Sequence, residues 1–322
     1  MAKQRLFLVL DTETTAPEFI NHITTTADER KKLAIAKPLV YDFGYVVVNA
    51  SGKIIKRVNY LVNEIYCNEP LFNTAYYAWK RPLYEAMLKK GTITTKPWMA
   101  IMREFANDLD TVEIATAFNA CFDFKKAIRY TCNYIYHFIY KGDFNEWIKA
   151  EEEKAKGILN GTYKAENPDY LMPWFTLFKK DYPITDLWTL ACNHLATSKQ
   201  YKYFCLKNNR YTASVQYYST TAETVFQYYT KDVEFNEEHT ALSDAEIEAV
   251  ILTKLLKAKK FGQEIKAFPF RELGTTIELA KGSPKYRKKI INALFKYIDK
   301  NDGFNRVNEG YWAKMVTMYN EL

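Results

Sequence analysis

The sequence predicts an α/β fold in which helices flank a mixed β-sheet. Residues 6–10 form an apolar run of the length of a buried strand, and two β-rich runs, 40–48 and 54–62, are joined by an Asn-Ala-Ser-Gly turn sequence. Farther along, short strand runs lead directly into helical patterns. These observations predict an antiparallel meander of three strands, extended by parallel strands and covered by helices.

The other elements follow from periodicity and capping signals. Thr95 is a possible N-cap of the second helix, whereas residues 200–218 are polar and aromatic without a clear period. Two further strands are expected at 113–117 and 181–186. The expected helices cover about 74–90, 97–109, 124–140, 187–196, 220–230 and 240–257.

Two acids end the first strand. Asp11 and Glu13 follow the apolar run at a spacing of two, which places both carboxylates on one face of a strand. Packing a hydrophobic core gives no reason for two acids there, and they would repel each other unless a cation lay between them. The pair therefore indicates a divalent metal site.

Three further acids and a histidine are candidates for the same site. Asp123 lies at the start of a helix that follows a strand, so it would reach the same end of the sheet, although for this residue considered alone an N-cap role is the favoured explanation. Asp186 ends another strand, and capping the next helix is the favoured reading for it. His239 precedes a helix whose first turn carries Asp244, but a lone histidine is more often structural.

Composition and charge bound the functional classes. The chain has 322 residues, 48% of them apolar and 26% charged, which is ordinary for a globular protein of one or two domains. Residues 254–300 contain 13 Lys and Arg against four Asp and Glu, a net charge of +9, while the whole chain carries +7. This basic segment suits a polyanion, and a solvated helical face is the alternative. The 25 tyrosines offer stacking surfaces for bases, but core filling explains them at least as well.

Cysteine spacing and hydropathy argue against other classes. The five cysteines form no pair or cluster with zinc-site spacing, so no structural zinc is expected. No stretch approaches the roughly 18 apolar residues of a membrane span, and the N-terminal apolar run is too short for a secretion signal. We therefore expect no membrane partner and a cytoplasmic location, which would be the host cytoplasm if the chain is phage-encoded.

Three motifs together resemble the DEDD superfamily of 3′-5′ exonucleases. Asp11-Thr-Glu13 follows an apolar strand, Asn119-Ala-Cys-Phe-Asp123 precedes a helix, and His239-Thr-Ala-Leu-Ser-Asp244 has the form of the DnaQ-like, histidine-bearing (DEDDh) branch. Each motif alone is weak, but their order and placement are specific. The resemblance implies an RNase-H-like exonuclease domain over residues 1–257, with insertions at about 16–39 and 141–180. Residues 258–322 fall outside it as a basic, mainly helical C-terminal extension.

The resemblance also implies a mechanism and roles for individual residues. Asp11, Glu13, Asp123 and Asp244 would bind two Mg²⁺ or Mn²⁺ ions, which suits hard cations that prefer carboxylate oxygens. His239 would accept the proton of the attacking water, because imidazole exchanges protons near neutral pH. Substrate contacts are expected from Thr12, Thr14 and Asn119.

The function expected on these grounds is metal-dependent removal of nucleoside monophosphates from a 3′ end. Single-stranded DNA or RNA is the expected substrate, and the sequence does not choose between them. A polymerase partner, if there is one, would be a separate chain. The alternative is a module with a nuclease fold that binds nucleic acid or a polymerase without cleaving, although acids facing phosphate would weaken such binding.

Overall fold

The computed structural model describes residues 5–15, 38–136, 153, 174–259, 269–300 and 306–321. Contacts divide the chain into two compact units. The first, which we call the sheet unit, comprises Met1–Asp186 and Glu237–Ala249; the second, the helical unit, comprises Leu187–Asn236 and Val250–Leu322. The expected boundary after residue 257 does not coincide with this division, because residues 187–236 group with the C-terminal part of the chain.

The sheet unit is built on a mixed sheet with the strand order β4-β3-β2-β1-β5-β7-β6. Its strands are β1 (Leu6–Thr14), β2 (Val40–Asn49), β3 (Ile54–Val62), β4 (Thr94–Lys96), β5 (Ile114–Ala117), β6 (Trp174–Leu177) and β7 (Lys180–Asp186). Strands β1 to β3 form the predicted antiparallel meander, and β5 and β7 extend it in parallel to β1. The edge strand β4 is parallel to β3, and β6 is antiparallel to β7.

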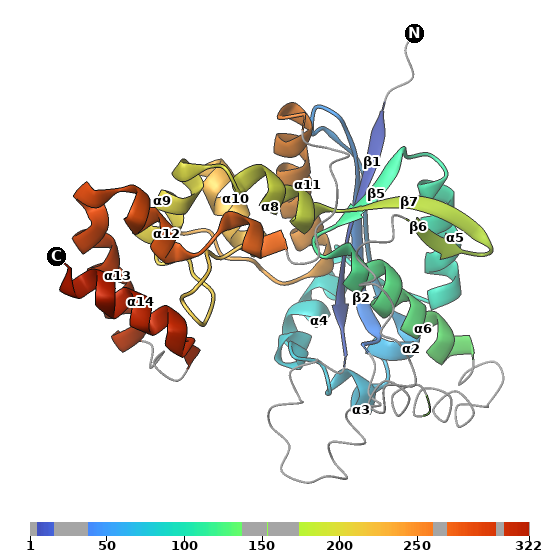
Figure 1. Ribbon diagram of the computed structural model, residues 1–322. Helices are drawn as coiled ribbons and strands as arrows, with labels where there is room; N and C mark the ends of the chain where they lie inside the picture. The colour runs from blue at the N-terminus through green and yellow to red at the C-terminus, as the bar shows by residue number, and fades with distance from the viewer. Residues whose placement is uncertain are drawn as a thin grey trace. The chain divides into compact units, whose positions relative to one another are not determined.

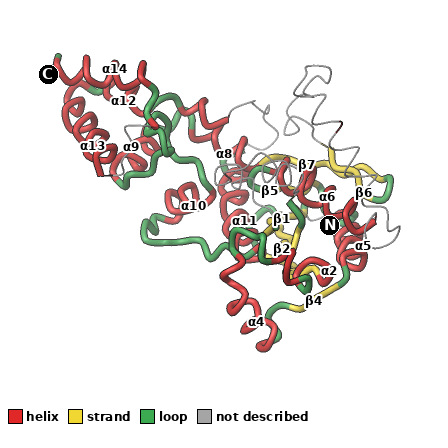
Figure 2. The backbone as a smooth tube through the Cα atoms, turned by 90° about the horizontal axis from the view of Figure 1, so that it is seen from below, coloured by secondary structure: helices red, strands yellow, loops and turns green. Residues whose placement is uncertain are grey.

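The two faces of this sheet differ in chemistry. On one face, Phe43 of β2 packs edge-on against Trp98 and Phe105 of α5 (Trp98–Leu109), at ring distances of 5.8 and 5.1 Å. The opposite face is covered by the first half of α11 (Ala241–Lys257), so that α5 and α11 lie on opposite sides of the strands (Figures 1 and 2). One face is therefore an aromatic core, and the other carries the acids of β1.

Several predicted boundaries in the sheet unit were wrong. The helix expected from residue 74 begins only at Ala78, as the 3-10 turn η2 (Ala78–Lys80), and continues as α4 (Arg81–Lys90). Thr95 does not cap α5; it lies in β4, where its backbone pairs with β3, and the N-cap position is taken by Pro97. The short helices α2 (Asn63–Tyr66) and α3 (Glu69–Phe72) follow β3.

The segment after β5 also departs from the expected N-cap geometry. It begins as the π-helical turn η3 (Cys121–Ala127) and continues as α6 (Ile128–Tyr134). Ala120 takes the N-cap position, so Asp123 is not a cap but a buried residue of the first turn. The expected insertion at 16–39 lies outside the described residues except for 38 and 39. Of the insertion expected at 141–180, residue 153 and residues 174–180 are described, and the latter supply β6 and the start of β7.

The helical unit packs around apolar and tyrosine side chains. Its elements are α8 (Leu187–Leu195), α9 (Lys199–Lys207), α10 (Ala222–Thr230), the last turns of α11, η6 (Pro269–Leu273), α12 (Thr276–Gly282), η7 (Pro284–Tyr286), α13 (Arg287–Lys300) and α14 (Glu309–Asn320). Helix α9 falls where no period was found, and Ser198 caps it by accepting a hydrogen bond from the backbone of Tyr201. Tyr201 and Tyr218 are fully buried here, which supports the core-filling explanation for these tyrosines.

The basic C-terminal segment uses one helix face for packing. In α13, Ile290, Ile291 and Leu294 are buried, and Phe295 contacts the ring of Trp312 at 5.2 Å. Lys288 and Lys289 remain exposed. A solvated basic face and a packed apolar face thus coexist on this helix. Among the described residues, no helix is both long and apolar enough to cross a membrane.

Candidate metal centre

The acids of β1 meet an acid of α11 on one face of the sheet. Asp11 and Glu13 lie opposite Gly44 and Asp42 in the β1–β2 register, which places all four residues on the same face. Carboxylate oxygens of Asp11, Glu13 and Asp244 lie within 4.8 Å of one another. Three of the acids identified in the sequence are therefore brought together from positions 11, 13 and 244.

Two features of β2 place α11 at this point. The backbone N–H of Ala241, at the start of α11, donates a hydrogen bond of 3.0 Å to the carboxylate of Asp42. At Gly44 the helix backbone comes so close that an added Cβ would lie 2.2 Å from the nitrogen of Leu242. The missing side chain therefore lets the first turn of α11 approach the strand, and this approach carries Asp244 to the carboxylates of β1.

Asp123 reaches the centre from the segment after β5, the strand that pairs with β1 on the edge away from β2. Its carboxylate accepts a buried hydrogen bond of 2.7 Å from the hydroxyl of Thr12. The turn from β5 into η3 passes through Asn119, whose φ of 73° is left-handed, and the Asn119 carbonyl accepts from the N–H of Phe122 at 2.8 Å. Asp123 is thus fixed beside β1, although it is not one of the three acids that share the 4.8 Å cluster.

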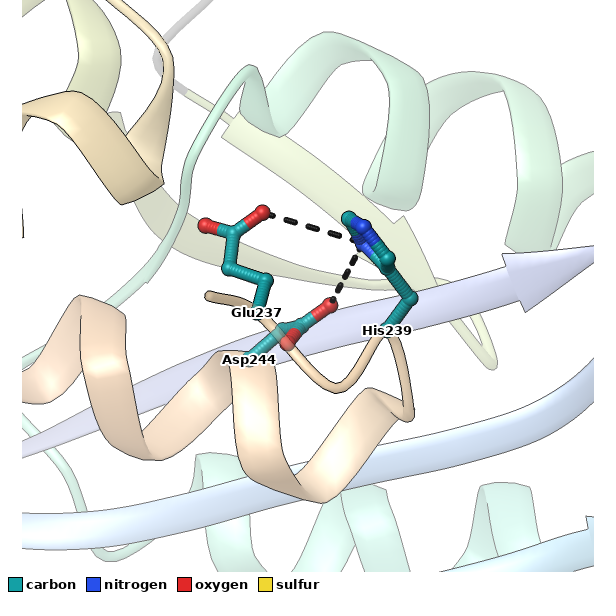
Figure 3. Close-up of side chains that lie close together, drawn as sticks. All are labelled: Glu237, His239 and Asp244. Carbon is teal, nitrogen blue, oxygen red and sulfur yellow. Dashed lines mark ion pairs between the residues drawn. The ribbon is translucent and has the colours of Figure 1, made fainter. Parts of the chain in front are cut away.

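His239 lies at the rim, on the loop before α11. Its Nδ1 is 3.7 Å from a carboxylate oxygen of Glu237 and 3.9 Å from one of Asp244, and Figure 3 shows both carboxylates directed at the same side of the ring. These atoms also form a second group of possible metal ligands. The side chain of His239 keeps 36% of its surface exposed, so solvent reaches the imidazole.

The histidine loop is held from η2. Tyr77 stacks on His239 with ring centroids 4.8 Å apart and planes inclined by 14°. The ammonium of Lys80, a residue only 5% exposed, donates hydrogen bonds to the carbonyls of Glu238 and His239 and lies 4.3 Å from the centroid of the Tyr77 ring. His239 has a left-handed φ of 51°, and these contacts stabilise that unusual backbone conformation.

Burial and mutual repulsion raise the pKa values of the carboxyl groups. Burial and then the neighbouring Asp123 raise the pKa of Asp11 well above its ordinary value, and burial and then Asp42 do the same for Glu13. Burial, reinforced by Glu237, raises the pKa of Asp244 to about 8. Asp123 has a pKa of about 7 because burial outweighs its hydrogen bond from Thr12.

Two buried acids of the centre were not identified in the sequence. Glu248 follows Asp244 by one helical turn on α11, is 2% exposed, and accepts a hydrogen bond of 3.0 Å from the N–H of Phe118. Burial and then Asp123 raise its pKa well above the ordinary value. Asp42 also accepts from the hydroxyl of Tyr84 at 2.9 Å. The sequence contained a signal for each acid. Glu248 follows Asp244 at the i, i+4 spacing of one helix face, and Asp42 is the lone acid within the apolar run of β2.

The donor set suits a hard divalent cation. Buried and half-buried carboxylates at this separation repel one another, and a buried charge without compensation is costly. The nearby ammonium of Lys80 is engaged by backbone carbonyls, and burial lowers its pKa. Mg²⁺ and Mn²⁺ prefer oxygen ligands of this kind. The residues present therefore fit a divalent metal, with Asp11, Glu13 and Asp244 as the ligands best supported by geometry.

The other residues singled out in the sequence lie at defined positions in the fold. Thr12 is buried and bonded to Asp123, and Thr14 follows an irregularity in the β1–β2 register after Glu13. Asn119 forms the left-handed turn described above. Asp186 is buried at the end of β7 and raises the pKa of Asp123, after the larger effect of burial. Substrate contacts of Thr12, Thr14 and Asn119 stay predictions.

Comparison with known proteins gives no independent assignment. No protein-family model, curated protein or solved structure matches this chain. Its function must therefore be inferred from the site itself.

Proposed function

We propose that this chain is a metal-dependent 3′-5′ exonuclease that releases nucleoside monophosphates from nucleic acid. The observation that carries the proposal is the cluster of Asp11, Glu13 and Asp244, in which Asp244 is buried and the other two acids are half-buried, with the partly exposed imidazole of His239 3.9 Å from Asp244. Phosphodiester hydrolysis by two metal ions needs hard ligands of this kind, and a group that accepts a proton at the rim. The three sequence motifs provide both.

The topology supports an RNase-H-like fold as part of this proposal. The antiparallel meander of β1 to β3 is extended beyond β1 by β5 and β7. Both of these strands run parallel to β1. This is the arrangement expected from the motif resemblance, with β4 and β6 as additional edge strands. The acids then lie at the end of the central strand β1, with Asp123 after the adjacent parallel strand.

The residues of the chain would divide the work as follows. Asp11, Glu13 and Asp244 would hold a divalent ion, and Asp123 would complete a pair of ion sites while Thr12 keeps its carboxylate oriented. Bound ions would stabilise the negative charge on the attacking and leaving oxygens of an in-line displacement at phosphorus. Glu248 and Asp42 lie behind these ligands, where they fix α11 and the β5 turn through backbone N–H groups.

His239 would accept the proton of the attacking water. Its ring has access to solvent, and its backbone and one ring face are held by Lys80 and Tyr77. A fixed imidazole at this distance from Asp244 can remove a proton without a rearrangement of the loop. Glu237, on the same side of the ring, would orient the imidazole through its carboxylate.

The test combines cleavage with metal binding. We would measure release of mononucleotides and stepwise shortening of single-stranded DNA and RNA oligonucleotides labelled at the 5′ end, in Mg²⁺, Mn²⁺ or EDTA, for wild type and His239→Ala. Isothermal titration with Mn²⁺ would measure ion binding directly. We expect stepwise release from the 3′ end that requires metal, loss of a factor of about 10² to 10⁴ in rate for His239→Ala, and Mn²⁺ binding that this variant retains.

Two results would overturn the proposal. Binding of the oligonucleotide without any release in either metal would favour the non-cleaving binding module instead. Failure of Mn²⁺ to bind in the titration would remove the metal centre on which the mechanism depends. Trp174→Ala, which changes an exposed residue of the edge strand β6, serves as the control variant and should match wild type in both assays.

A further inference from the structure

A cleft lined by cationic side chains lies between three helices of the helical unit. Helices α12, α13 and α14 pack together at the C-terminal end of the chain (Figures 1 and 2). The cleft between them has a volume of about 390 Å³, and its walls carry Lys281 of α12, Arg287 of α13 and Lys314 of α14. We call it the α12–α14 cleft.

The walls of this cleft are held in place by buried contacts. The hydroxyl groups of Thr276 on α12 and Tyr311 on α14 are hydrogen-bonded to each other inside the core. Ile290 and Ile291 of α13 are buried, and Met318 of α14, which lines the cleft, is only 8% exposed. The packing of the unit therefore sets the backbone positions from which the three cations reach the cleft.

Arg287 has a buried donor without an acceptor. Its Nε is inaccessible to solvent and has no hydrogen-bond partner among the described residues. The side chain pairs only loosely with Glu321, because Nη1 lies 3.8 Å from the carboxylate oxygen and the side chain of Glu321 is 58% exposed. A donor left without an acceptor costs free energy, so a ligand that accepts hydrogen bonds would be stabilised here. Because 26% of the Arg287 side chain is exposed, a modest rotation of the guanidinium can present Nε to such a ligand.

The two lysines of the cleft are available to the same ligand. Lys281 and Lys314 are exposed, and neither ammonium is paired with another described residue. Both also line a second, smaller cleft of about 220 Å³, so the two clefts share these cations. Among the described residues that line the α12–α14 cleft, three cations face one acid, which gives it a net charge of +2. This charge favours an anion.

Other cations of the basic segment do not converge in this way. Lys288 and Lys289 follow Arg287 on α13, but they are exposed and do not line the cleft. The structure thus divides the basic side chains of this helix between a solvated face and a discrete cleft. A solvated face attracts polyanions without fixing them, whereas a cleft with converging donors can hold one anionic group at a defined place.

We propose that the α12–α14 cleft binds a phosphate group through Arg287, Lys281 and Lys314. A guanidinium pairs with phosphate oxygens through several N–H groups at once, and ammonium groups add charge around the same anion. The hydroxyl of Thr317, which also lines the cleft, can donate to a phosphate oxygen. Both the backbone of a nucleic-acid strand and a free phosphomonoester carry such a group. All residues of the cleft belong to the helical unit, so the site goes beyond the proposed nuclease activity and does not require the metal centre.

The experiment tests the cleft in protein freed of metal with a chelating resin, because bound metal would itself attract phosphate. Isothermal titration at low salt would measure the affinity for inorganic phosphate, a nucleoside 5′-monophosphate and a short oligodeoxythymidylate. The cleft variants are Lys314→Gln, Arg287→Gln and Arg287→Lys. Lys289→Gln, which removes an equal charge from an exposed residue outside the cleft, is the matched control. Thermal unfolding would establish that each variant is folded.

We expect wild type to bind at least one of these ligands, and Lys314→Gln and Arg287→Gln each to weaken that binding about tenfold, because each variant removes a charged hydrogen bond. Arg287→Lys should recover only part of the loss, since it keeps the charge without the planar donor group. Lys289→Gln should match wild type. If Arg287→Gln does not fold, Lys314→Gln still provides the test, because Lys314 is exposed.

Two results would overturn the site. One is the absence of binding for all three ligands. The other is an equal loss of affinity in Lys314→Gln and Lys289→Gln, which would describe a diffuse basic surface instead of a cleft.

The three ligands also distinguish the source of the phosphate group. Binding that depends on Lys314 and is tightest for the oligonucleotide would assign the cleft to a strand backbone. Tightest binding of a small ligand, with the same dependence, would assign it to a free phosphate or phosphomonoester. Neither result depends on cleavage. A chain that never degrades nucleic acid can still bind phosphate here, and failure of the cleft would leave the exonuclease proposal standing.

Discussion

The two units of the molecule bury polar groups of different kinds. In the sheet unit the buried set includes charged residues, Asp42, Lys80, Asp123, Asp244 and Glu248 among them. In the described part of the helical unit the buried polar residues are Thr and Gln, and several have partners, as when Gln227 donates to the carbonyl of Phe235 at 2.7 Å.

This difference distinguishes the sheet unit, which contains the candidate metal centre, from the helical unit, in which the described buried polar residues are neutral. Buried hydroxyls and amides with hydrogen bonds add modestly to stability, whereas clustered carboxylates oppose folding unless they are protonated or bind a cation. The sheet unit therefore carries a destabilising arrangement for which packing gives no reason. A substitution that removes a carboxylate from the cluster should therefore raise stability and lower activity. A substitution in the core of the helical unit should lower stability and leave the metal response unchanged.

Removing a carboxylate from the cluster should have the largest effect. Asp11→Asn keeps the size of the side chain but removes a charge and a metal ligand. We expect nuclease activity to fall more than about a hundredfold, since loss of an outer-shell partner alone costs about 10- to 100-fold. In EDTA the melting temperature should rise, because a source of repulsion is gone. A melting temperature that falls in EDTA would contradict the view that the cluster opposes folding.

Gly44→Ala should show how strongly the site depends on one close approach. The new Cβ would lie 2.2 Å from the backbone nitrogen of Leu242 and 2.4 Å from the carbonyl carbon of Ala241, so the helix backbone must move. We expect a loss of about 3 kcal/mol in the free energy of unfolding, at the upper end for overpacking, together with weaker Mn²⁺ binding as Asp244 shifts. Gly282→Ala, with open space around the position, is the control for urea unfolding and titration. Unchanged unfolding in Gly44→Ala would show that α11 is not held by this contact.

The pH dependence of stability should reveal the acids without any substrate. Burial raises the pKa of Asp123 to about 7 and that of Asp244 to about 8 in the folded chain, against an ordinary value of 3.8. Between about pH 4 and pH 8 the folded chain therefore binds more protons than the unfolded chain, so the stability of metal-free protein falls as the pH rises. Mn²⁺ competes with these protons and should raise the melting temperature more at pH 8 than at pH 5. Scanning calorimetry in EDTA and in Mn²⁺ measures this, and an equal metal shift at both pH values would speak against the cluster as the binding site.

A substitution in the helical unit should have the smallest effect. The hydroxyl of Thr276 bonds to the carbonyl of Val215 at 2.8 Å and to the hydroxyl of Tyr311, inside the core. Thr276→Val should cost about 1 kcal/mol in the free energy of unfolding, measured in urea, because both partners lose a hydrogen bond. The metal-induced rise in melting temperature should stay as in wild type. A reduced metal response would show that the two units are energetically coupled.

Local patterns predicted the elements that carry the site. The apolar run and the paired acids identified β1 with Asp11 and Glu13, and the hairpin signal identified β2 and β3. The helix with Asp244 was found in its correct place, to within one residue at its start. The predictions of secondary structure were wrong where contacts between residues distant in the sequence decide the conformation. Thr95 looked like a cap but pairs with β3, and the first turn of the helix expected from residue 74 is replaced by the turn that carries Tyr76, so that the helical structure begins only at Ala78.

The sequence by itself determined which residues have the chemistry for a metal centre, because residue type and spacing are properties of the chain. Only the tertiary structure decided which distant residues complete it. Glu248, Lys80 and Tyr77 join the site through burial, hydrogen bonds to the loop of His239 and ring stacking. Such contacts depend on how β2, η2 and α11 pack. The packing of α11 on β2 requires a close approach of the helix backbone to Gly44, and only the folded structure shows this approach.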